Sequence, residues 1–364
     1  MPFLNQVKND GVKGRQLAFF GAFVLPISKL VEAPSLLSKY AQGDLLLPAL
    51  LHFISQTAVL CLILFCLSRL QKPLGQIFQE RLGKWKYAIY LPYALFFLFF
   101  AVLPLLDLEK FVHAVFYDTP PTLFTFLFFF PIVAFLCCKG LKTVGRFSDL
   151  SLFLFLAPFL LLIIFSLEEA DISGLLPLFE KPFQNSLSAC KVTVPHFTDA
   201  LLYLPLLLNY RYQKGDGKKI IGGYAVGGFF TLLFLAVFYG VYSTIAFKQR
   251  YAFSKIAQYF PALATVGRID LLLVYILCIV LFVYTALPLF YATVCLSRPF
   301  KKANQPLIGV IITLLALLFT LFFNRRYDSV YELFTQKLFW LYLLFGSVLP
   351  LTLFLFKRKT RYEK

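Results

Sequence analysis

Residues 21–34 read Gly21-Ala-Phe-Val-Leu-Pro26-Ile-Ser-Lys29-Leu-Val-Glu32-Ala-Pro34. This stretch predicts an interrupted membrane helix, because it combines the apolar character of a membrane span with residues that interrupt a helix. It lies within the apolar run Gln16–Leu37, which is long enough to cross a bilayer. Each proline removes a backbone donor. The lysine and the glutamate are costly in hydrocarbon unless they are paired or face a cavity. Interrupted spans of this kind occur where protein or a water-filled cavity surrounds them.

The rest of the chain consists largely of similar apolar runs. The 364 residues are 60% hydrophobic, and the mean hydropathy is +0.77. Soluble domains contain roughly 45–50% apolar residues. We therefore predict an all-α integral membrane protein of ten spans: Gln16–Leu37, Leu45–Leu70, Tyr87–Leu106, Thr122–Cys138, Leu150–Leu167, Leu187–Leu208, Ile220–Phe247, Leu271–Leu296, Leu307–Phe323 and Leu338–Phe356. The third span is expected to continue to Tyr117, and residues 250–266 to form a short re-entrant or interfacial helix.

The net charge of +17 follows from this topology and does not require a nucleic-acid partner. When the loops are assigned alternately to the two sides, 23 of the 35 Lys and Arg residues fall on the side of both termini. Cytoplasmic loops carry such an excess. We predict cytoplasmic termini and one transmembrane permease-like domain over residues 1–364, with a cytoplasmic segment at 1–14 and a cytoplasmic basic tail at 357–364.

The sixth predicted span resembles the first in having a polar centre that contains proline. It reads Cys190-Lys-Val-Thr193-Val-Pro195-His196-Phe-Thr198-Asp199-Ala-Leu-Leu-Tyr203-Leu-Pro205. Two interrupted spans five apart among ten fit a fold of five-plus-five inverted repeats, in which such breaks form the binding site near mid-membrane. The breaks therefore locate the candidate site.

Each polar residue at the breaks allows a structural role as well as a functional one. Lys29 and Glu32 are spaced as a helix-surface pair. Asp199 is either a cation or proton-relay site, or is hydrogen-bonded to backbone freed by Pro205. Tyr284 either lines the cavity or packs in the bundle. Other residues read with both roles are Pro26 and Pro195 (simple kinks), His196 (a satisfied polar residue), Asp107 (the outer interface), and Thr285 and Pro288 (bundle packing).

The cysteines and histidines give no pattern typical of catalysis or metal binding. The seven cysteines read as small membrane-compatible residues and not as a disulfide framework. His52, His113 and His196 fall in different segments. We expect no cofactor, metal ion, catalytic residue or enzyme activity. A membrane enzyme, such as a transferase acting on a lipid-linked glycan, would need carboxylates or histidines gathered on one face.

Short motifs along nearly the whole chain resemble the permease-like B subunit of bacterial spore germinant receptors, a branch of the amino acid–polyamine–organocation superfamily. Leu45-Leu46 replaces the family's Ala-Trp, and Asp270 replaces its Glu. The motifs are Gly14-Arg15-Gln16-Leu17, Gly43-Asp44, Leu74-Gly75-Gln76-Ile77 with Leu82-Gly83-Lys84-Trp85, Leu175-Leu176-Pro177-Leu178, and Tyr259-Phe260-Pro261 through Gly267-Arg268-Ile269-Asp270.

The resemblance implies a LeuT-like fold with broken helices 1 and 6 in the inner membrane of a bacterial cell or spore. It also implies sensing of an amino acid-like nutrient together with A- and C-type subunits. On this hypothesis, backbone amides from Pro26 to Lys29 bind a carboxylate, and carbonyls with Thr198 or Asp199 hold an ammonium group. Candidate binding residues are Gly21, Pro26, Ser28, Lys29, Thr198, Asp199 and Tyr203, and candidate coupling or gating residues are Glu32, Asp199 and Tyr284.

A proton- or sodium-coupled secondary amino acid transporter is the alternative function. It would use the same pocket, and Asp199, Lys29 or Glu32 would provide the coupling charge. Concentrative uptake separates a transporter from a sensor. In both cases the partners are a small polar nutrient and the lipid bilayer.

Overall fold

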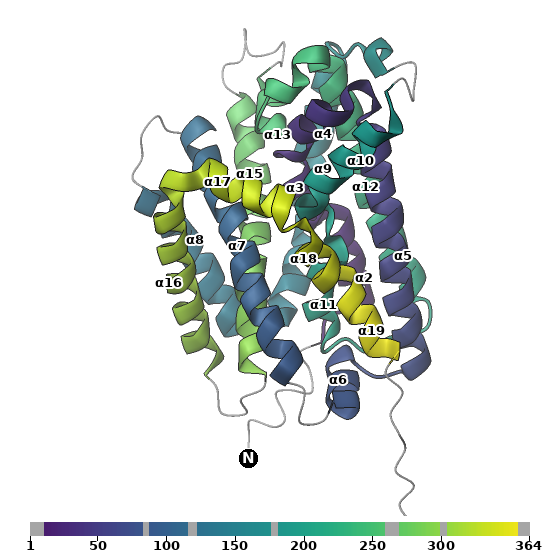
Figure 1. The fold of residues 1–364 in the computed structure, drawn as a ribbon, viewed down its shortest axis with the longest axis vertical. Helices are drawn as coiled ribbons and strands as arrows, with labels where there is room; N and C mark the ends of the chain where they lie inside the picture. Colours follow the sequence, from purple (N-terminus) through teal and green to yellow (C-terminus); the bar gives the residue numbers. More distant parts are fainter. Residues whose placement is uncertain are drawn as a thin grey trace, which may run out of the picture.

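The structure is a computed structural model that describes residues 11–82, 87–115, 122–175, 181–258, 269–298 and 304–355. All regular elements in these ranges are helical, and most of the long helices run along one axis (Figure 1). The expected all-α class is confirmed. The longer helices are α5 (Leu46–Leu70), α7 (Tyr87–Val115), α8 (Thr122–Lys139), α9 (Leu141–Ser166), α10 (Phe183–Phe197), α12 (Asp216–Tyr242), α15 (Ile269–Ser297) and α16 (Gln305–Phe323).

Six helical segments of the described chain are long and apolar enough to cross a membrane, and a bent pair in the first span makes a seventh. The remaining three predicted spans correspond to α8, to α10 followed by α11 (Asp199–Leu207), and to the C-terminal run α18 (Phe339–Leu343), η9 (Leu344–Val348) and α19 (Leu349–Leu355). The observed helices agree with about ten spans, as predicted.

Several predicted boundaries differ from the observed ones. The fifth span begins at Leu141 and not at Leu150, because Gly140, at φ 78°, allows the chain to turn sharply after α8. The third continues to Val115, and its expected end at Tyr117 lies outside the described residues. Within 250–266 a short helix, α13 (Ala252–Ala257), is present, and residues 259–266 lie outside the described part.

The first span is helical from Gly14 to Lys29 and then bends by 63°. It comprises α2 (Gly14–Phe19), the π-turn η2 (Phe20–Val24), α3 (Pro26–Lys29) and α4 (Ala33–Ala41). The break lies at residues 30–32, and not at the predicted Pro26–Lys29. Pro26 is accommodated directly after the π-turn, where the helical hydrogen-bond ladder already shifts by one residue.

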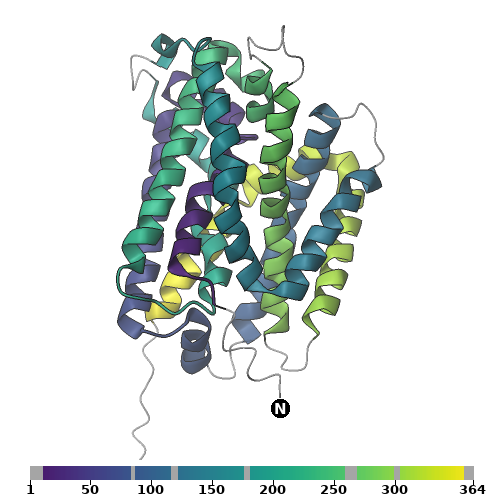
Figure 2. The ribbon, with the colours of Figure 1, turned by 180° about the vertical axis from the view of Figure 1, so that it is seen from behind.

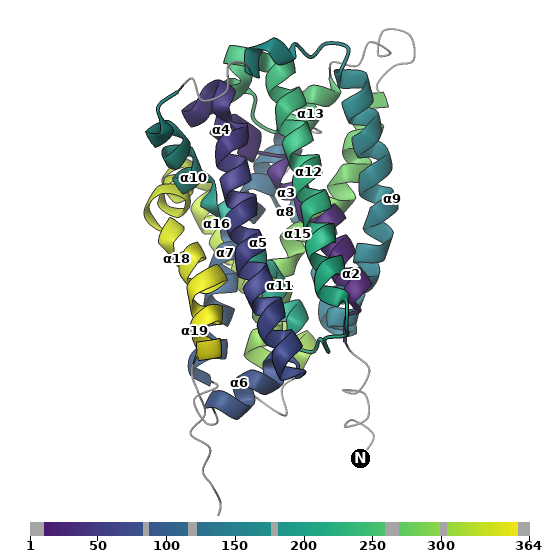
Figure 3. The ribbon, with the colours of Figure 1, turned by 90° about the vertical axis from the view of Figure 1, so that its right-hand side faces the viewer.

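The carbonyls freed at this break are satisfied by α13. The Leu30 carbonyl accepts from the Phe253 amide at 3.0 Å, and the Val31 carbonyl accepts from the Ala252 amide at 2.8 Å. Bare carbonyls inside a membrane protein are costly, so these two bonds allow the first span to open. Figures 1 and 3 place α13 and α4 at the same end of the molecule.

Close packing holds the inner half of the first span against α12. A Cβ at Gly223 would meet the carbonyl of Ala18, and a Cβ at Gly227 would meet that of Gly21. Spacing of small residues by four lets two helix backbones approach closely. Gly223 and Gly227 are therefore packing residues at the contact between α12 and the first span. On the rear face, α9 lies against the first span and beside α15 (Figure 2).

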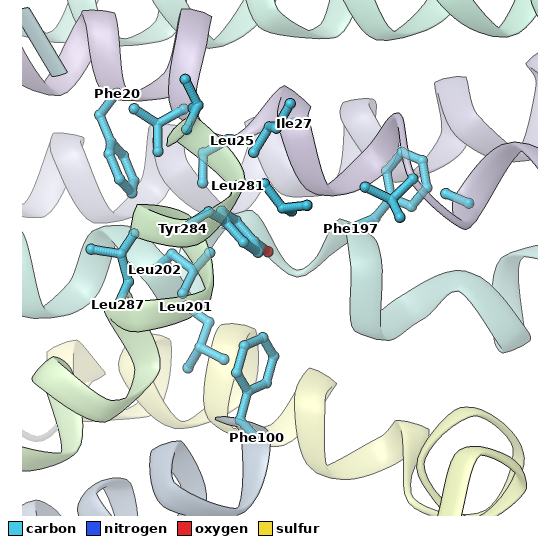
Figure 4. Close-up of a cluster of buried hydrophobic side chains, with 14 of the residues drawn as sticks. Phe20, Leu25, Ile27, Phe100, Phe197, Leu201, Leu202, Leu281, Tyr284 and Leu287 are labelled. Carbon is cyan, nitrogen blue, oxygen red and sulfur yellow. The ribbon is translucent and has the colours of Figure 1, made fainter. Parts of the chain in front are cut away.

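The buried centre of the bundle is formed by α7 and α15, each of which has 67% of its apolar window buried, against 28% for the helical segment that begins with α16. Figure 4 shows apolar side chains from the first span, α7, α11 and α15 gathered beside the two breaks, with Tyr284 among them. Helix α16 therefore presents mainly apolar side chains outward, as expected of a helix facing lipid.

The first and last described helices lie at the same end of the molecule. Figure 3 shows the start of α2, the end of α19 and the short helix α6 (Leu74–Leu82) there, opposite α4 and α13. An even number of crossings gives this arrangement. We call the end with α2 and α6 the inner end and the end with α4 and α13 the outer end.

Candidate functional site

The two broken spans meet at a buried ion pair between the last residue of α3 and the first residue of α11. Lys29 Nζ lies 2.7 Å from Asp199 Oδ1, and the two side chains are only 1% and 2% exposed. The sixth span breaks at Thr198, whose ψ of 62° separates α10 from α11, so Asp199 begins a new helix at that point. We call Lys29, Asp199 and their partner Tyr224 the central cluster.

Every charged group in the central cluster has several partners. Lys29 Nζ also donates to the Leu25 carbonyl at 3.1 Å and lies 5.5 Å from the ring centroid of Phe197. Tyr224 of α12 donates its hydroxyl to Asp199 Oδ2 at 2.7 Å. Both carboxylate oxygens of Asp199 are therefore hydrogen-bonded. A buried pair is tolerated when its remaining polar atoms are satisfied in this way.

The break in the sixth span is stabilised from α5 and from its own side chains. Gln56 Oε1 accepts from the amide of Ala200 at 3.1 Å, and Thr198 Oγ1 donates to the Val194 carbonyl at 2.7 Å. His52 stacks on Phe197, with ring centroids 4.7 Å apart. Helix α5 thus provides both a hydrogen-bond acceptor, Gln56, and a stacking ring, His52, for this unwound segment.

Gly21 and Tyr203, two predicted binding residues, pack together below the central cluster. The Tyr203 hydroxyl donates to the Leu17 carbonyl at 3.3 Å, and a Cβ at Gly21 would meet that hydroxyl. Both residues are buried. They position the first span against α11, whereas Pro26 packs near Gly227 of α12.

A cavity of about 50 Å³ lies on the outer side of the breaks. Ser28, one residue before Lys29, lines this cavity, as does Tyr284 of α15. Its polar lining includes Glu32, Asp107, His196 and Thr285, and its walls are otherwise apolar, with Phe100, Phe111 and Tyr342 among them. Of the predicted residues, Ser28, Glu32 and Tyr284 therefore lie at this cavity.

Glu32 does not pair with Lys29, although their spacing allowed it. Its Oε1 accepts from Arg250 Nε at 2.7 Å. Arg250 also donates to the hydroxyl of Tyr327 in α17 (Tyr327–Glu332), and that hydroxyl donates to Asp107 Oδ1 at 2.6 Å. We call Glu32, Arg250, Tyr327 and Asp107 the outer cluster.

Sequence reasoning missed several residues that contact the predicted ones. Tyr224, Gln56, Arg250 and Tyr327 all contribute hydrogen bonds to the two breaks or the outer cluster. The sequence could have indicated Tyr224, because it follows Gly223, a small residue at which two helices approach closely. Arg250 and Tyr327 fell outside the ten predicted spans, where hydropathy does not reveal which polar side chain faces inward.

The histidines differ in their surroundings. His52 Nε2 lies 3.1 Å from both the Cys190 carbonyl and Thr193 Oγ1, whereas His196 Nε2 is buried and has no hydrogen-bond partner in the described part of the chain. Within the ranges that the structure describes, no three His, Cys, Asp or Glu residues are grouped so that they could hold a metal ion. Both histidines flank the break in the sixth span.

An all-helical bundle with about ten spans, two of them broken and joined by a buried polar cluster, defines a multi-pass membrane protein of the permease type. A family model described as "Spore germination protein" matches residues 42–328. The chain belongs to this family of permease-like spore germination proteins, which confirms the resemblance.

Two solved structures of one transporter support the same fold. A manganese transporter from Eremococcus coleocola, in complex with an aromatic bis-isothiourea compound, aligns with a TM-score of 0.56 and 15% identity over 92% of this chain and 78% of that one. A mutant of that transporter aligns equally well. The inward-facing form of Mhp1 aligns with a TM-score of 0.41 and 13% identity, over 93% and 74% of the two chains. A comparison with curated proteins found no significant match.

Proposed function

We propose that the protein is the nutrient-sensing permease-like subunit of a spore germinant receptor and that it binds an amino acid-like germinant at the central cluster. The observation that supports this most directly is the Lys29–Asp199 pair, which lies where both broken spans meet. A free amino acid carries one ammonium and one carboxylate group. It can insert between the two side chains, so that its ammonium replaces Lys29 on Asp199 and its carboxylate replaces Asp199 on Lys29.

This arrangement revises the source of the carboxylate contact. The amides of Pro26 to Lys29 lie within a continuous helix, and proline has none, so Lys29 is the better donor. Thr198 stays beside the ammonium end of the ligand. Ser28 and Tyr284 line the adjacent outer cavity, which provides the approach from outside.

Binding would couple to motion because the pair joins the two broken spans. Exchanging a direct contact between α3 and α11 for a ligand-bridged one separates the breaks by the length of the ligand. Movement of spans one and six relative to the rest would then pass occupancy to A- and C-type subunits. We place the inner end, with both termini, in the cytoplasm of a bacterial cell or spore.

Germination of spores tests this proposal. A deletion strain is complemented with the wild type, with Asp199→Asn, or with the double variant Lys29→Met/Asp199→Leu, and exposed to a panel of amino acids and sugars. We expect the deletion to lose its response to one nutrient and only the wild type to restore it. Immunoblots of the spore membrane control for protein level. A normal response in the double variant would refute binding at this pair.

Secondary transport is a second candidate function, favoured by the broken spans and by the carboxylate of Glu32 beside the outer cavity. The solved structures of similar fold include a manganese transporter. Uptake of the active nutrient into proteoliposomes, with and without a proton or sodium gradient, separates the two functions. Concentrative uptake that depends on Asp199 would establish transport.

A further inference from the structure

A larger cavity, with a volume of about 820 Å³, lies at the inner end of the molecule. It lies between the start of α2, the helix α6, the loop from α11 to α12 and the residue that follows α15. Figure 3 shows α2, α6 and α11 at this end. Segments far apart in the sequence thus contribute to one cavity. Five of its lining side chains are basic, namely Lys13, Arg15, Arg211, Lys219 and Arg298.

The basic side chains of this inner cavity outnumber its carboxylates. Asp216 is the one acidic residue in the described lining, and it already accepts from the Tyr210 hydroxyl and lies 3.6 Å from Lys219 Nζ. Arg15 pairs at 3.1 Å with Asp149, which does not line the cavity. Within the ranges that the structure describes, no ion pair involves the other three cations, Lys13, Arg211 and Arg298.

Arg298 is held at the wall of the inner cavity by uncharged neighbours. Its Nη2 donates to Asn209 Oδ1 at 2.6 Å, and a Cβ at Gly75 would meet its Nη1. The Gly75 amide donates to the Leu208 carbonyl at 3.0 Å, which fixes α6 beside the end of α11. The positive-inside rule accounts for basic residues at this end. It does not require a positioned arginine without a carboxylate partner, so this arrangement points to an anionic ligand.

We propose that the inner cavity is a binding site for a diphosphate group, with Lys13, Arg211 and Arg298 as its main cationic ligands. A single phosphate group carries about −1.5 to −2 charge at pH 7, so two of them balance these cations. A guanidinium also matches two phosphate oxygens at once. Side-chain amides in the lining provide further donors, namely those of Gln76, Gln79, Asn209 and Gln213.

The size and polarity of the inner cavity favour a diphosphate ester over a smaller anion. Ligand sites typically have volumes of about 300–1,000 Å³, so this cavity has room for an organic group beside the two phosphates. A carboxylate or a chloride ion carries a single charge and would leave most of the cations unbalanced. A soluble diphosphate ester and a lipid with a diphosphate headgroup provide the same chemistry, and the experiment below separates them.

A ligand in the inner cavity would join segments of both broken spans. It would contact the residues before α2 in the first span and those after α11 in the sixth, together with Arg298. Because it binds the observed arrangement, it would stabilise that arrangement of the inner end. The site uses none of the central cluster, so it does not rest on the proposed function. It provides a point at which a phosphorylated compound on the cytoplasmic side regulates the protein.

Calorimetry with inorganic pyrophosphate tests the proposal, with the full-length protein in phosphatidylcholine nanodiscs and no divalent ions. We expect saturable binding that Arg298→Gln weakens by about tenfold or more, and Lys13→Gln/Arg211→Gln by at least as much. If Arg298→Gln does not fold, as judged by size exclusion, the double variant decides the result, because both of its side chains are exposed.

A matched control separates the site from the net charge of the inner end. Lys214→Gln/Lys218→Gln also removes two exposed cations, from the segment next to the cavity, but neither side chain lines it. This variant should bind pyrophosphate within about twofold of the wild type. Sulfate at equal ionic strength should compete at least about tenfold less well than pyrophosphate itself.

A lipid with a diphosphate headgroup, a long-chain prenyl diphosphate placed in the nanodisc, identifies the source of the ligand. If it displaces pyrophosphate, the site takes a lipid headgroup, and if it does not, the site takes a soluble ester. Either result agrees with a diphosphate site. The proposal is overturned by the absence of saturable pyrophosphate binding, by equal competition from sulfate, or by equal weakening in the Lys214→Gln/Lys218→Gln and Lys13→Gln/Arg211→Gln variants.

Discussion

The central and outer clusters are both groups of charges at the break in the first span, yet they differ in burial and in how their charges are balanced: the Arg250 side chain is 41% exposed, whereas Lys29 and Asp199 are 1% and 2% exposed. In the central cluster one ammonium faces one carboxylate, and every charged atom has a partner. In the outer cluster two carboxylates share one cation, and Glu32 Oε2 has no hydrogen-bond donor among the described residues. Glu32 and Asp107 of the outer cluster line the cavity, whereas the central cluster approaches it only through Ser28, the residue before Lys29.

The difference indicates two kinds of role. A balanced and fully bonded pair holds the two broken helices together. The outer cluster instead leaves one buried carboxylate oxygen beside the cavity without a donor among the described residues. Variants that unbalance the central cluster should therefore be far more harmful than equivalent changes elsewhere, and the predictions below rank these effects.

The largest effect is expected from Asp199→Ala, which leaves Lys29 buried without a counter-charge. Breaking a buried pair by removing one partner costs about 3–5 kcal/mol. The free energy of unfolding, measured by denaturant titration in micelles, should fall by that amount. The matched variant Lys29→Met/Asp199→Leu removes both charges and should remain within about 1 kcal/mol of the wild type. Equal losses in the two variants would show that charge balance is not the cause.

The second effect is expected from Tyr224→Phe, which removes the hydroxyl bound to Asp199 Oδ2 and keeps the ring. A hydrogen bond to a charged group contributes about 1.5–3 kcal/mol. The same titration should show a loss in this range. Tyr212→Phe, on the loop before α12, is a control whose hydroxyl accepts from the uncharged Gly217 amide. A similar loss in the control would contradict the assignment to the central cluster.

The third effect is expected from Gly227→Ala, which places a methyl group against the Gly21 carbonyl. Overpacking of a tight interface costs about 1–3 kcal/mol. Separation of α12 from the first span should also weaken nutrient binding, because Tyr224 lies on the same helix. In Gly222→Ala the added methyl group meets open space, so the free energy of unfolding should stay the same or rise slightly. If Gly227→Ala and Gly222→Ala both left the free energy of unfolding unchanged, α12 and the first span would not be tightly packed.

Much of the fold followed from the sequence, because hydropathy and charge asymmetry act over long stretches. The apolar runs located ten spans, and the prolines with Lys29 and Asp199 marked the first and sixth as broken. The position of the first break was wrong by several residues. A proline signals a missing donor, but the chain accommodates it with a π-turn and opens where α13 can satisfy the carbonyls.

The partners within the site could not be predicted, because they depend on distances between segments far apart in the chain. Lys29 and Glu32 looked like a pair at helical spacing, and the bend between them instead sends Lys29 to Asp199 and Glu32 to Arg250. The sequence period describes a continuous helix, and it fails where the helix breaks. The residues at the break are also those that form the central and outer clusters, so their partners were the hardest to predict.

The smallest effect is expected at Lys72–Glu80, an ion pair at the inner end whose side chains are 48% and 43% exposed. Its N–O distance of 2.7 Å equals that of Lys29–Asp199, so the two differ in burial and not in length. Exposed pairs contribute about 0–1 kcal/mol because water competes for both charges. Glu80→Ala should therefore change the free energy of unfolding by less than about 1 kcal/mol, and added salt should reduce even that difference. A loss as large as that of Asp199→Ala would mean that distance, and not burial, sets the strength of these pairs, and the contrast between the central cluster and the rest of the molecule would no longer hold.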